Sequence, residues 1–348
     1  MKTRATKATE FQLNRPANSA IMLDFWQHGT VMELIRGVHN LRPRHQGCVA
    51  TIGNFDGVHA GHRAIIGQLA AKAHALQLPS VVMVFEPQPR EFFAPEQAPA
   101  RLMTFREKCE VLAAEGVDRV LCVRFDNRFS AQSAQDFCDH ILIQGLGIRH
   151  LVVGDDFRFG HDRSGDFAFL CKAGEKAGFS VEHTCTFEMD GERVSSTRVR
   201  ETLERSDFAA AARLLGQPFF MSGKVIHGQR LGRTIGVPTA NLLPKRIRTP
   251  ISGVYAVEME GLDGGIYQGV ANLGTSPTVN GQRVRLEVHL FDFNQDIYGR
   301  QVRVIFRHKI RDEKKFSGLD ALKAAIQQDI QTAREFFSHA LSNSNTGN

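Results

Sequence analysis

Short apolar runs alternate with amphipathic stretches over the first two thirds of the chain. Strands are predicted at 49–52, 81–85, 119–123, 151–153 and 181–186, and helices at 61–76, 105–115, 134–144 and 167–177. Ser130 is the expected N-cap of the helix at 134–144. This alternation is typical of a parallel sheet with helices on both faces and ligands at the carboxyl ends of its strands. We therefore predict an α/β domain over residues 32–206.

The pattern changes after an alanine-rich segment, 207–218, which is expected to be a linking helix. Short alternating runs follow at 219–226, 254–259, 266–273, 284–293 and 301–307, separated by Gly, Asn, Asp or Pro. Such runs predict a small antiparallel β-barrel. A last helix is expected at about 319–338, so that the second domain covers 219–340. We expect each half to bury its own core.

The two ends of the chain lie outside this pattern. Residues 1–31 have a mild basic bias, and their apolar run at 20–23 is too short for a signal sequence. We expect 1–31 to be a disordered extension, with Met32 as the hypothetical native start. The last residues, 341–348, are expected to form a disordered tail.

Length and composition favour a soluble globular protein of two domains. A chain of 348 residues exceeds one ordinary core, and 42% hydrophobic with 23% charged residues is typical of soluble proteins. Six cysteines without a C-x-x-C pair indicate free thiols in the cytoplasm rather than disulfides or zinc. The net charge of +6 suits phosphorylated small molecules, and we expect neither a nucleic-acid nor a membrane partner.

The most informative stretch is GNFDGVHAGH, the turn between the strand at 49–52 and the next helix. Gly53, Gly57 and Gly61 would let a phosphate approach the backbone, and the helix start offers unpaired N–H groups. The glycine spacing matches neither a P-loop nor a dinucleotide fingerprint. His59 and His62 can instead donate hydrogen bonds to a phosphate that gains charge during attack. The ordinary alternative is a Gly-rich connection with two solvated histidines.

Two later stretches fall at the same edge of the predicted sheet. GDDFRFG, which contains Asp156, follows its strand directly, as a ligand-binding loop would. SSTRVR places Ser196, Thr197 and Arg200 at a helix start, where hydroxyls and a guanidinium can hold the outgoing phosphates of ATP. For the serines, simple helix capping is the alternative.

Three patches of the barrel region carry candidate chemistry. GQRLGR, at 228–233, is a basic loop suited to closing over phosphates. Thr239 and Asn241 are two residues apart in VPTAN and can present neutral oxygens to a nucleotide-bound Mg²⁺. Glu287 lies on the polar face of an alternating strand and can take a proton from a substrate hydroxyl. Taken singly, each patch also fits an ordinary turn, a bend at proline or an exposed strand carboxylate.

Together these motifs resemble the bifunctional bacterial riboflavin kinase/FAD synthetase family. GNFDGVHAGH, VGDDFRFG, VSSTRVR, GRTIGVPTAN, GVYAV, GVANLGTSPT and LEVHLFDF occur in the family's order from about Met32 to the last helix. The resemblance implies a Rossmann-like nucleotidylyltransferase domain followed by a riboflavin kinase barrel. It also implies two steps that use ATP and Mg²⁺: riboflavin to FMN, then FMN to FAD with release of pyrophosphate. One departure is Gln88 in FEPQP, where many relatives carry histidine.

The resemblance also assigns roles to individual residues. His59 and His62 would stabilise the reacting α-phosphate, and Glu287 would be the base on the ribityl hydroxyl. The ATP-binding residues would be Gly53, Asn54, Phe55, Gly57, Gly61, Ser196, Thr197, Arg200, Gly228, Arg230, Gly232 and Arg233. Thr239 and Asn241 would ligate Mg²⁺, and the candidate flavin contacts are Asp156, Asn272 and Thr278.

Three other functions compete with this one. A different small-substrate nucleotidylyltransferase would explain the first half but not PTAN and LEVH. A flavin-binding carrier would need neither phosphate site. A non-enzymatic interaction protein would be expected to carry a damaged H-x-G-H, which is intact here. We therefore expect an enzyme whose partners are riboflavin, FMN and ATP, and the sequence leaves its oligomeric state open.

Overall fold

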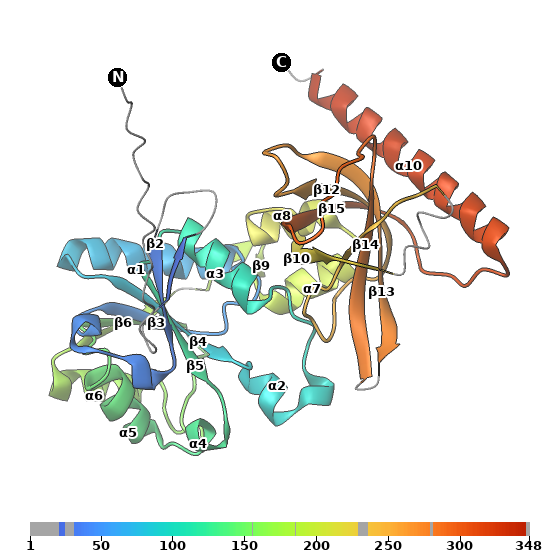
Figure 1. Cartoon of the computed structure of the whole chain (residues 1–348). Coiled ribbons are helices and arrows are strands. Elements are labelled where there is room, and N and C mark those ends of the chain that lie inside the picture. The colour runs from blue at the N-terminus through green and yellow to red at the C-terminus, as the bar shows by residue number, and fades with distance from the viewer. Residues whose placement is uncertain are drawn as a thin grey trace, which may run out of the picture.

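The computed structural model describes residues 21–24, 31–154, 156–184, 186–228, 236–278 and 281–345. These residues form an α/β domain and a β-barrel domain, with a long C-terminal helix against the barrel (Figure 1). The predicted fold class is confirmed in both halves.

The first domain is built on a seven-stranded sheet in the order β1-β2-β5-β4-β3-β6-β7. Only β1 runs antiparallel to its neighbour, and the other pairs are parallel. The strands are β1 Ile21–Asp24, β2 Val31–Arg36, β3 Val49–Ile52, β4 Ser80–Glu86, β5 Arg119–Arg124, β6 His150–Gly154 and β7 Ser180–Thr184. The chain crosses from one side of β3 to the other between β5 and β6, so a ligand crevice is expected at the carboxyl ends of β3 and β6.

Helices cover both faces of this sheet. Helices α1 Ala60–Leu76 and α3 Phe105–Ala114 pack on one face, through Leu69 and Leu112 among others. Helices α5 Ala134–Phe137, its π-helical continuation Cys138–Ile143, and α6 Phe167–Ala177 pack on the other face. Because both faces are buried, the strands read as continuous apolar runs in the sequence.

Smaller elements connect these layers, and one of them corrects the predicted N-cap at Ser130. They are α2 Pro89–Phe93, α4 Asn127–Ser130, the hairpin of β8 Glu188–Met189 and β9 Glu192–Arg193, and 3₁₀ turns at Val38–Asn40, Pro43–His45 and Pro95–Gln97. The predicted N-cap at Ser130 is wrong, because Ser130 ends α4. Ser133 caps α5 instead, since its hydroxyl and the Asp136 carboxylate accept each other's backbone N–H groups.

The chain ends also differ from the prediction where the structure describes them. Residues 21–24 form β1, which pairs with β2, so the predicted disordered extension is wrong for these four residues. Helix α10 Leu319–Asn345 continues past the expected end at Ser338 and takes in 341–345, the first part of the predicted tail.

The second domain is a closed six-stranded barrel in the order β10-β11-β14-β13-β12-β15. All its neighbouring strands are antiparallel, and β15 closes the barrel by pairing with both β12 and β10. The strands are β10 Phe220–Ile226, β11 Ala240–Leu242, β12 Gly253–Glu260, β13 Tyr267–Thr278, β14 Gly281–Leu290 and β15 Gln301–Arg311. The predicted barrel is confirmed, although the three-residue strand β11 was not foreseen. Helix α10 packs outside it through Ala333 and Phe337.

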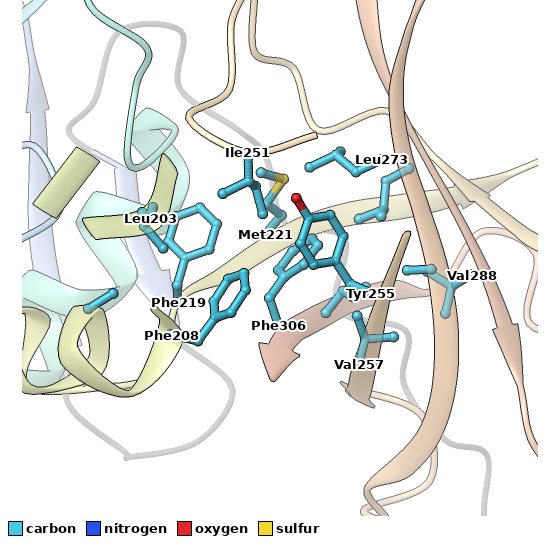
Figure 2. Close-up of a cluster of buried hydrophobic side chains, with 14 of the residues drawn as sticks. Leu203, Phe208, Phe219, Met221, Ile251, Tyr255, Val257, Leu273, Val288 and Phe306 are labelled. Carbon is cyan, nitrogen blue, oxygen red and sulfur yellow. The ribbon is translucent and has the colours of Figure 1, made fainter. Parts of the chain in front are cut away.

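Helices α7 Ser196–Glu204 and α8 Phe208–Leu215 join the two domains through a shared core. Figure 2 shows Phe208 of α8 beside Tyr255 and Phe306 of the barrel, with ring centroids 5.7 Å apart for Phe208 and Tyr255. Leu102 and Leu203 of the first domain belong to the same cluster. The expectation that each half buries its own core is therefore wrong at this junction.

A buried ion pair crosses the same junction. Glu107 of α3 and Arg246 of the barrel domain are both fully buried, and Nη2 of Arg246 lies 2.6 Å from Oε2 of Glu107. The other carboxylate oxygen accepts the backbone N–H of Ser222 in β10. A buried charge is tolerated only when it is paired and hydrogen-bonded, so each domain completes the other here.

Glu107→Gln should destabilise the protein, because it leaves the Arg246 guanidinium buried without a counter-charge. Breaking one side of a buried pair typically costs about 3–5 kcal/mol, and urea unfolding should show a loss of that size. Adding Arg246→Met should recover much of it. Glu96→Gln is the matched control, since its partner Arg248 makes an exposed ion pair. Equal stability of Glu107→Gln and the parent would contradict the assignment.

Candidate functional site

The first candidate site lies where β3 ends and α1 begins. His59 is the N-cap of α1, and its Nδ1 accepts the backbone N–H of His62 over 3.4 Å. The two imidazole rings stack with centroids 3.8 Å apart. A Cβ on Gly61 would lie 3.2 Å from Nδ1 of His59 and 3.3 Å from the carbonyl oxygen of Val194, so a larger residue would force a shift. Both histidines lie at the start of a helix, as predicted.

Both imidazoles are neutral in the free protein at physiological pH. Burial, helped by nearby arginines, lowers the pKa of His59 to about 4, although Asp56 acts in the opposite direction. Burial and the neighbouring His59 hold the pKa of His62 well below its usual value. Because Nδ1 of His59 accepts a hydrogen bond, its proton resides on Nε2. Nε2 of His59 is therefore the donor available to a phosphate oxygen.

Asp56 organises the turn, and our sequence reasoning missed it. Its buried carboxylate accepts the backbone N–H groups of Leu102 and Met103, each at 3.1 Å, and a hydrogen bond from Arg200. Its backbone carbonyl accepts the Ser196 hydroxyl at 2.9 Å. The signal was present in the sequence, because a carboxylate inside a phosphate-binding turn would repel the ligand unless a cation neutralised it.

The residues predicted to bind phosphate at the start of α7 differ in the contacts that they make in the structure. Arg200 donates from Nε to the carbonyl of Ala100 at 2.6 Å and from Nη2 to Asp56, so these contacts serve the architecture of the turn. Ser195 caps α7 by accepting the N–H of Arg198 at 3.2 Å, as the capping alternative requires. Thr197 is exposed in the first turn of α7.

The remaining turn residues divide between core and surface. The Phe55 side chain is 1% exposed and lies in the core beneath His62, with ring centroids 4.8 Å apart. Only the Phe55 backbone is thus left for a nucleotide. Gly57 has φ +86°, and a Cβ there would lie 2.8 Å from Leu102. Asn54 is exposed beside Gly53.

Asp156 lies just beyond β6, whose carboxyl end shares the sheet edge with β3. Its exposed carboxylate is 3.3 Å from Nη2 of Arg193, on the hairpin that leads into α7. The structure therefore connects the GDDFRFG loop to the segment before SSTRVR, as the prediction of a common edge requires. Residue 155 lies outside the described residues.

The second candidate site is a cavity of about 340 Å³ between the barrel and α10. Thr239, Asn272, Glu287 and His289 line its barrel side, and Phe316, Leu319, Leu322 and Ile326 line the side formed by α10 and the segment before it. Apolar residues of the barrel and the charged Arg311, Glu313, Lys314 and Asp329 complete the lining, so the cavity combines apolar and polar surface, which suits a flat apolar ring that carries a polar chain.

Strand register determines which polar side chains lie together on the barrel side of the cavity. Glu287 of β14 pairs with Asn241 of β11 on one side and with Asn272 of β13 on the other. Residues directly opposite on antiparallel strands lie on the same face, with Cβ atoms about 5 Å apart. The neighbours Leu286 and Val288 are fully buried, so Glu287 is on the outward face, as predicted. The side chain of Glu287 is 32% exposed and lies 3.4 Å from Arg285.

The predicted Mg²⁺ ligands fit a nucleotide-bound ion. Thr239 lines the cavity, and Asn241 uses its amide N–H to bond the Thr239 carbonyl at 3.3 Å, which leaves its amide oxygen as an acceptor. A Cβ on Gly228 would lie within 2.6 Å of the Asn241 side chain, so the backbone of Gly228 runs against this site. Within the described part of the chain no group of three or more His, Cys, Asp or Glu could form a metal cage. One or two protein oxygens plus phosphates is the usual way Mg²⁺ is bound in kinases.

One predicted flavin contact, Thr278, lies away from the cavity. Thr278 pairs with Gly281 at the tip of the β13–β14 hairpin, six residues from Asn272. At about 3.3 Å per residue, the two backbones lie roughly 20 Å apart. The loop residues Arg230, Gly232 and Arg233 lie outside the described residues.

Comparisons with known proteins divide the chain in the same way as the two domains of the structure. A model of the FAD synthetase family matches residues 41–198, and a model of the riboflavin kinase family matches residues 215–337. A bifunctional riboflavin kinase/FMN adenylyltransferase of Pseudomonas fluorescens is 55% identical over 304 residues, which are 87% of this chain and 97% of that protein. The chain belongs to the bifunctional riboflavin kinase/FMN adenylyltransferase family. It is thus an enzyme with both activities, as the sequence predicted.

Other members of this family are similarly close. Those of Escherichia coli strain K12 and Haemophilus influenzae are 55% and 50% identical, over 88% of this chain each and over 98% and 99% of those proteins. A solved structure named as a macrolide-efflux protein from Streptococcus pneumoniae superposes with TM-score 0.72 at 31% identity, covering 86% of this chain and 98% of that one. Among the described helices, none has the length and apolar character to cross a membrane.

The low pKa of His59 should make stability depend on pH. The unfolded protein binds a proton at His59 near pH 6.5 and the folded protein only near pH 4, so unfolding free energy should fall as the pH drops through this window. The difference corresponds to about 3 kcal/mol. His59→Asn keeps an N-cap oxygen but cannot titrate, so urea unfolding between pH 7 and pH 4 should show a weaker pH dependence. The exposed His74→Asn is the control, and identical pH dependence in both variants would contradict the prediction.

Proposed function

We propose that each domain carries out one of the enzyme's two ATP-dependent reactions. The barrel domain, residues 219–340, phosphorylates riboflavin to FMN. The α/β domain, residues 32–206, adenylylates FMN to FAD and releases pyrophosphate, and 207–218 links the two. The observation that supports this division best is that each family model covers one domain, and each domain holds one cluster of suitable chemistry.

In the adenylylation site, a phosphate oxygen of FMN attacks the α-phosphorus of ATP and the bond to pyrophosphate breaks. His59 and His62 donate hydrogen bonds as negative charge builds on the α-phosphate. Neutral imidazoles do this without placing a second cation beside Arg200. Thr197 and the backbone N–H groups at the start of α7, that of Ser196 included, hold the leaving pyrophosphate, while the Ser196 hydroxyl bonds the Asp56 carbonyl. Asp56 and Arg200 keep α7 beside the histidine turn.

In the kinase site, the terminal ribityl hydroxyl of riboflavin attacks the γ-phosphorus of ATP, the bond from this phosphorus to the β–γ bridging oxygen breaks, and ADP leaves. Glu287 takes the hydroxyl proton, and Asn272 beside it orients the ribityl chain. The isoalloxazine ring lies against the apolar side chains on the α10 side of the cavity, which include Phe316 and Leu322. Thr239 and Asn241 would hold Mg²⁺, which neutralises phosphate charge when bound. The basic residues of GQRLGR, at 228–233, would supply charge to the ATP phosphates.

Substrates and compartment follow from the same chemistry. The partners of the enzyme are riboflavin, FMN and ATP, with neither nucleic acid nor membrane involved. The described cysteines are all free, and burial raises the pKa of the Cys48 thiol to about 12. Unreactive thiols of this kind favour the reducing cytoplasm as the place of action.

A fragment that begins at Phe208 should convert riboflavin to FMN and make no FAD. It retains α8, whose Phe208, Leu214 and Leu215 pack in the barrel core. A matched fragment that begins at Phe219 loses these side chains and should be unfolded by circular dichroism. Chromatography of the flavins measures both activities. A folded Phe208 fragment without kinase activity would refute the assignment of chemistries.

His59→Ala and His62→Ala should each abolish most FAD formation while FMN accumulates from riboflavin. Loss of one donor aimed at a developing charge typically costs about a hundred- to a thousand-fold in rate. His74→Ala, on the exposed side of α1, is the control. Normal FAD formation by both variants would return the two histidines to a structural role.

Glu287→Gln should lose most FMN production from riboflavin and still make FAD when FMN is supplied. General-base catalysis typically contributes about a hundred- to ten-thousand-fold, although phosphoryl transfer depends strongly on positioning. Glu258→Gln, whose carboxylate pairs with Arg307 on the same barrel, is the control. Full kinase activity in Glu287→Gln would remove this carboxylate from the mechanism.

A further inference from the structure

A bidentate ion pair at the kinase cavity has no part in the chemistry described above. Arg311 ends β15, where it pairs with Val254 of β12, and its side chain reaches Asp329 on α10. Nε and Nη2 of Arg311 donate to the two oxygens of the Asp329 carboxylate at 2.8 and 2.7 Å. Both residues line the cavity between the barrel and α10. The pair thus joins the two parts of the protein that enclose the proposed riboflavin site.

The geometry of this pair favours a role in orientation. The side chain of Asp329 is 6% exposed and that of Arg311 is 22% exposed. Because burial of two charges offsets most of their attraction, such a pair contributes little more stability than apolar residues of the same size. A guanidinium that bonds both oxygens of one carboxylate is nevertheless restricted to a narrow range of orientations. The pair therefore fixes α10 in one position against the end of β15.

The same guanidinium also holds the segment between β15 and α10. Its Nη1 donates to the carbonyl of Asp312 at 3.0 Å, and its Cζ lies 5.5 Å from the centre of the Phe316 ring. The ammonium of Lys314 lies 5.4 Å from the centre of the same ring. Phe316 lines the cavity. All three nitrogens of the Arg311 side chain are thus engaged, and they connect the barrel, this segment and α10.

A second bidentate pair joins α10 to the barrel domain without lining the cavity. Arg334 donates from both Nη atoms to the Asp292 carboxylate, at 3.0 Å each. This pair is exposed, since 48% of the Arg334 side chain and 78% of the Asp292 side chain are accessible. Neither residue lines the cavity. The two pairs therefore allow the attachment of α10 to be compared with the shape of the cavity.

We propose that Arg311 and Asp329 are positioning residues for riboflavin, because their ion pair holds α10 and Phe316 in the arrangement that receives the isoalloxazine ring. The inference rests on the proposed function, in which the flavin occupies this cavity. The reacting side of the site does not depend on the pair, since Glu287 and Asn241 are opposite each other on the barrel strands β14 and β11. A preorganised cavity lowers the cost of ordering side chains when a ligand binds. The pair therefore acts on riboflavin affinity and not on the transfer of the phosphoryl group.

Asp329→Asn in the full-length enzyme tests this role. The substitution keeps the size of the side chain but removes the charge that orients Arg311. The KM for riboflavin, and the Kd from titration of riboflavin fluorescence, should each rise about tenfold, as expected when the ligand must order one or two side chains. The kcat for FMN formation should stay within about twofold of the parent, because loss of binding alone raises KM. FAD formation from supplied FMN should not change.

Two further variants separate positioning from the general attachment of α10. Arg311→Lys keeps the positive charge but cannot bond both oxygens in the same way, so its KM for riboflavin should lie between those of the parent and of Asp329→Asn. Asp292→Asn breaks the exposed pair with Arg334 and should leave the KM for riboflavin unchanged. Equal rises of KM in Asp292→Asn and Asp329→Asn would overturn the inference, because any loosening of α10 would then have the same effect.

Leu322→Trp distinguishes the inference from the proposed function. Leu322 lines the α10 side of the cavity, and an indole in its place should fill the cavity and abolish riboflavin binding. If this variant loses riboflavin binding while Asp329→Asn binds riboflavin as the parent does, the inference is overturned and the proposed site stands. Normal riboflavin binding by Leu322→Trp would instead refute the proposed site. If Asp329→Asn does not fold, Arg311→Lys is measured in its place, and a parental KM for riboflavin there would also overturn the inference.

Discussion

The hydrogen bonds of the Asp56 carboxylate hold the first candidate site together. Asp56 lies in the turn after β3, and its carboxylate bonds two segments from distant parts of the chain, the one before α3 and the helix α7. A carboxylate can do this in a phosphate-binding turn only because Arg200 balances its charge. The repulsion that a carboxylate would exert on an anionic ligand is thus reduced within the free protein, by the pairing of Asp56 with Arg200.

Arg200 illustrates how a motif residue can serve the reaction indirectly. Its position in SSTRVR suggested a phosphate ligand, yet in the structure it donates to Asp56 and to the Ala100 carbonyl. The hydroxyl of Ser196 binds the same turn. The start of α7 is therefore aimed at the histidine pair by the fold itself, and the backbone N–H groups of α7 remain for the leaving phosphates.

Sequence reasoning recovered the features that depend on local pattern. The apolar run at 49–52 with its glycine turn, and the alternation around Glu287, each report which face of one element is buried. The pairing of Asp56 with Arg200 joins residues 144 positions apart, and no periodicity encodes such a contact. Strand β11 was not predicted, because three residues close after a proline are too few to show an alternating pattern. The shared core of the two domains was not predicted either, because the apolar face of α8 does not indicate which domain covers it.

The position of helix α3 between the two domains has a consequence for how the protein loses stability. Successive side chains on it face different domains, since Glu107 bonds Arg246 of the barrel domain and Nζ of Lys108 lies 3.9 Å from Glu86 of the sheet. With Leu102 and Leu203 also in the shared core, neither domain can lose its packing without exposing apolar surface of the other. Unfolding of one domain is therefore expected to be coupled to that of the other. A substitution that loosens either domain should lower the stability of its neighbour as well.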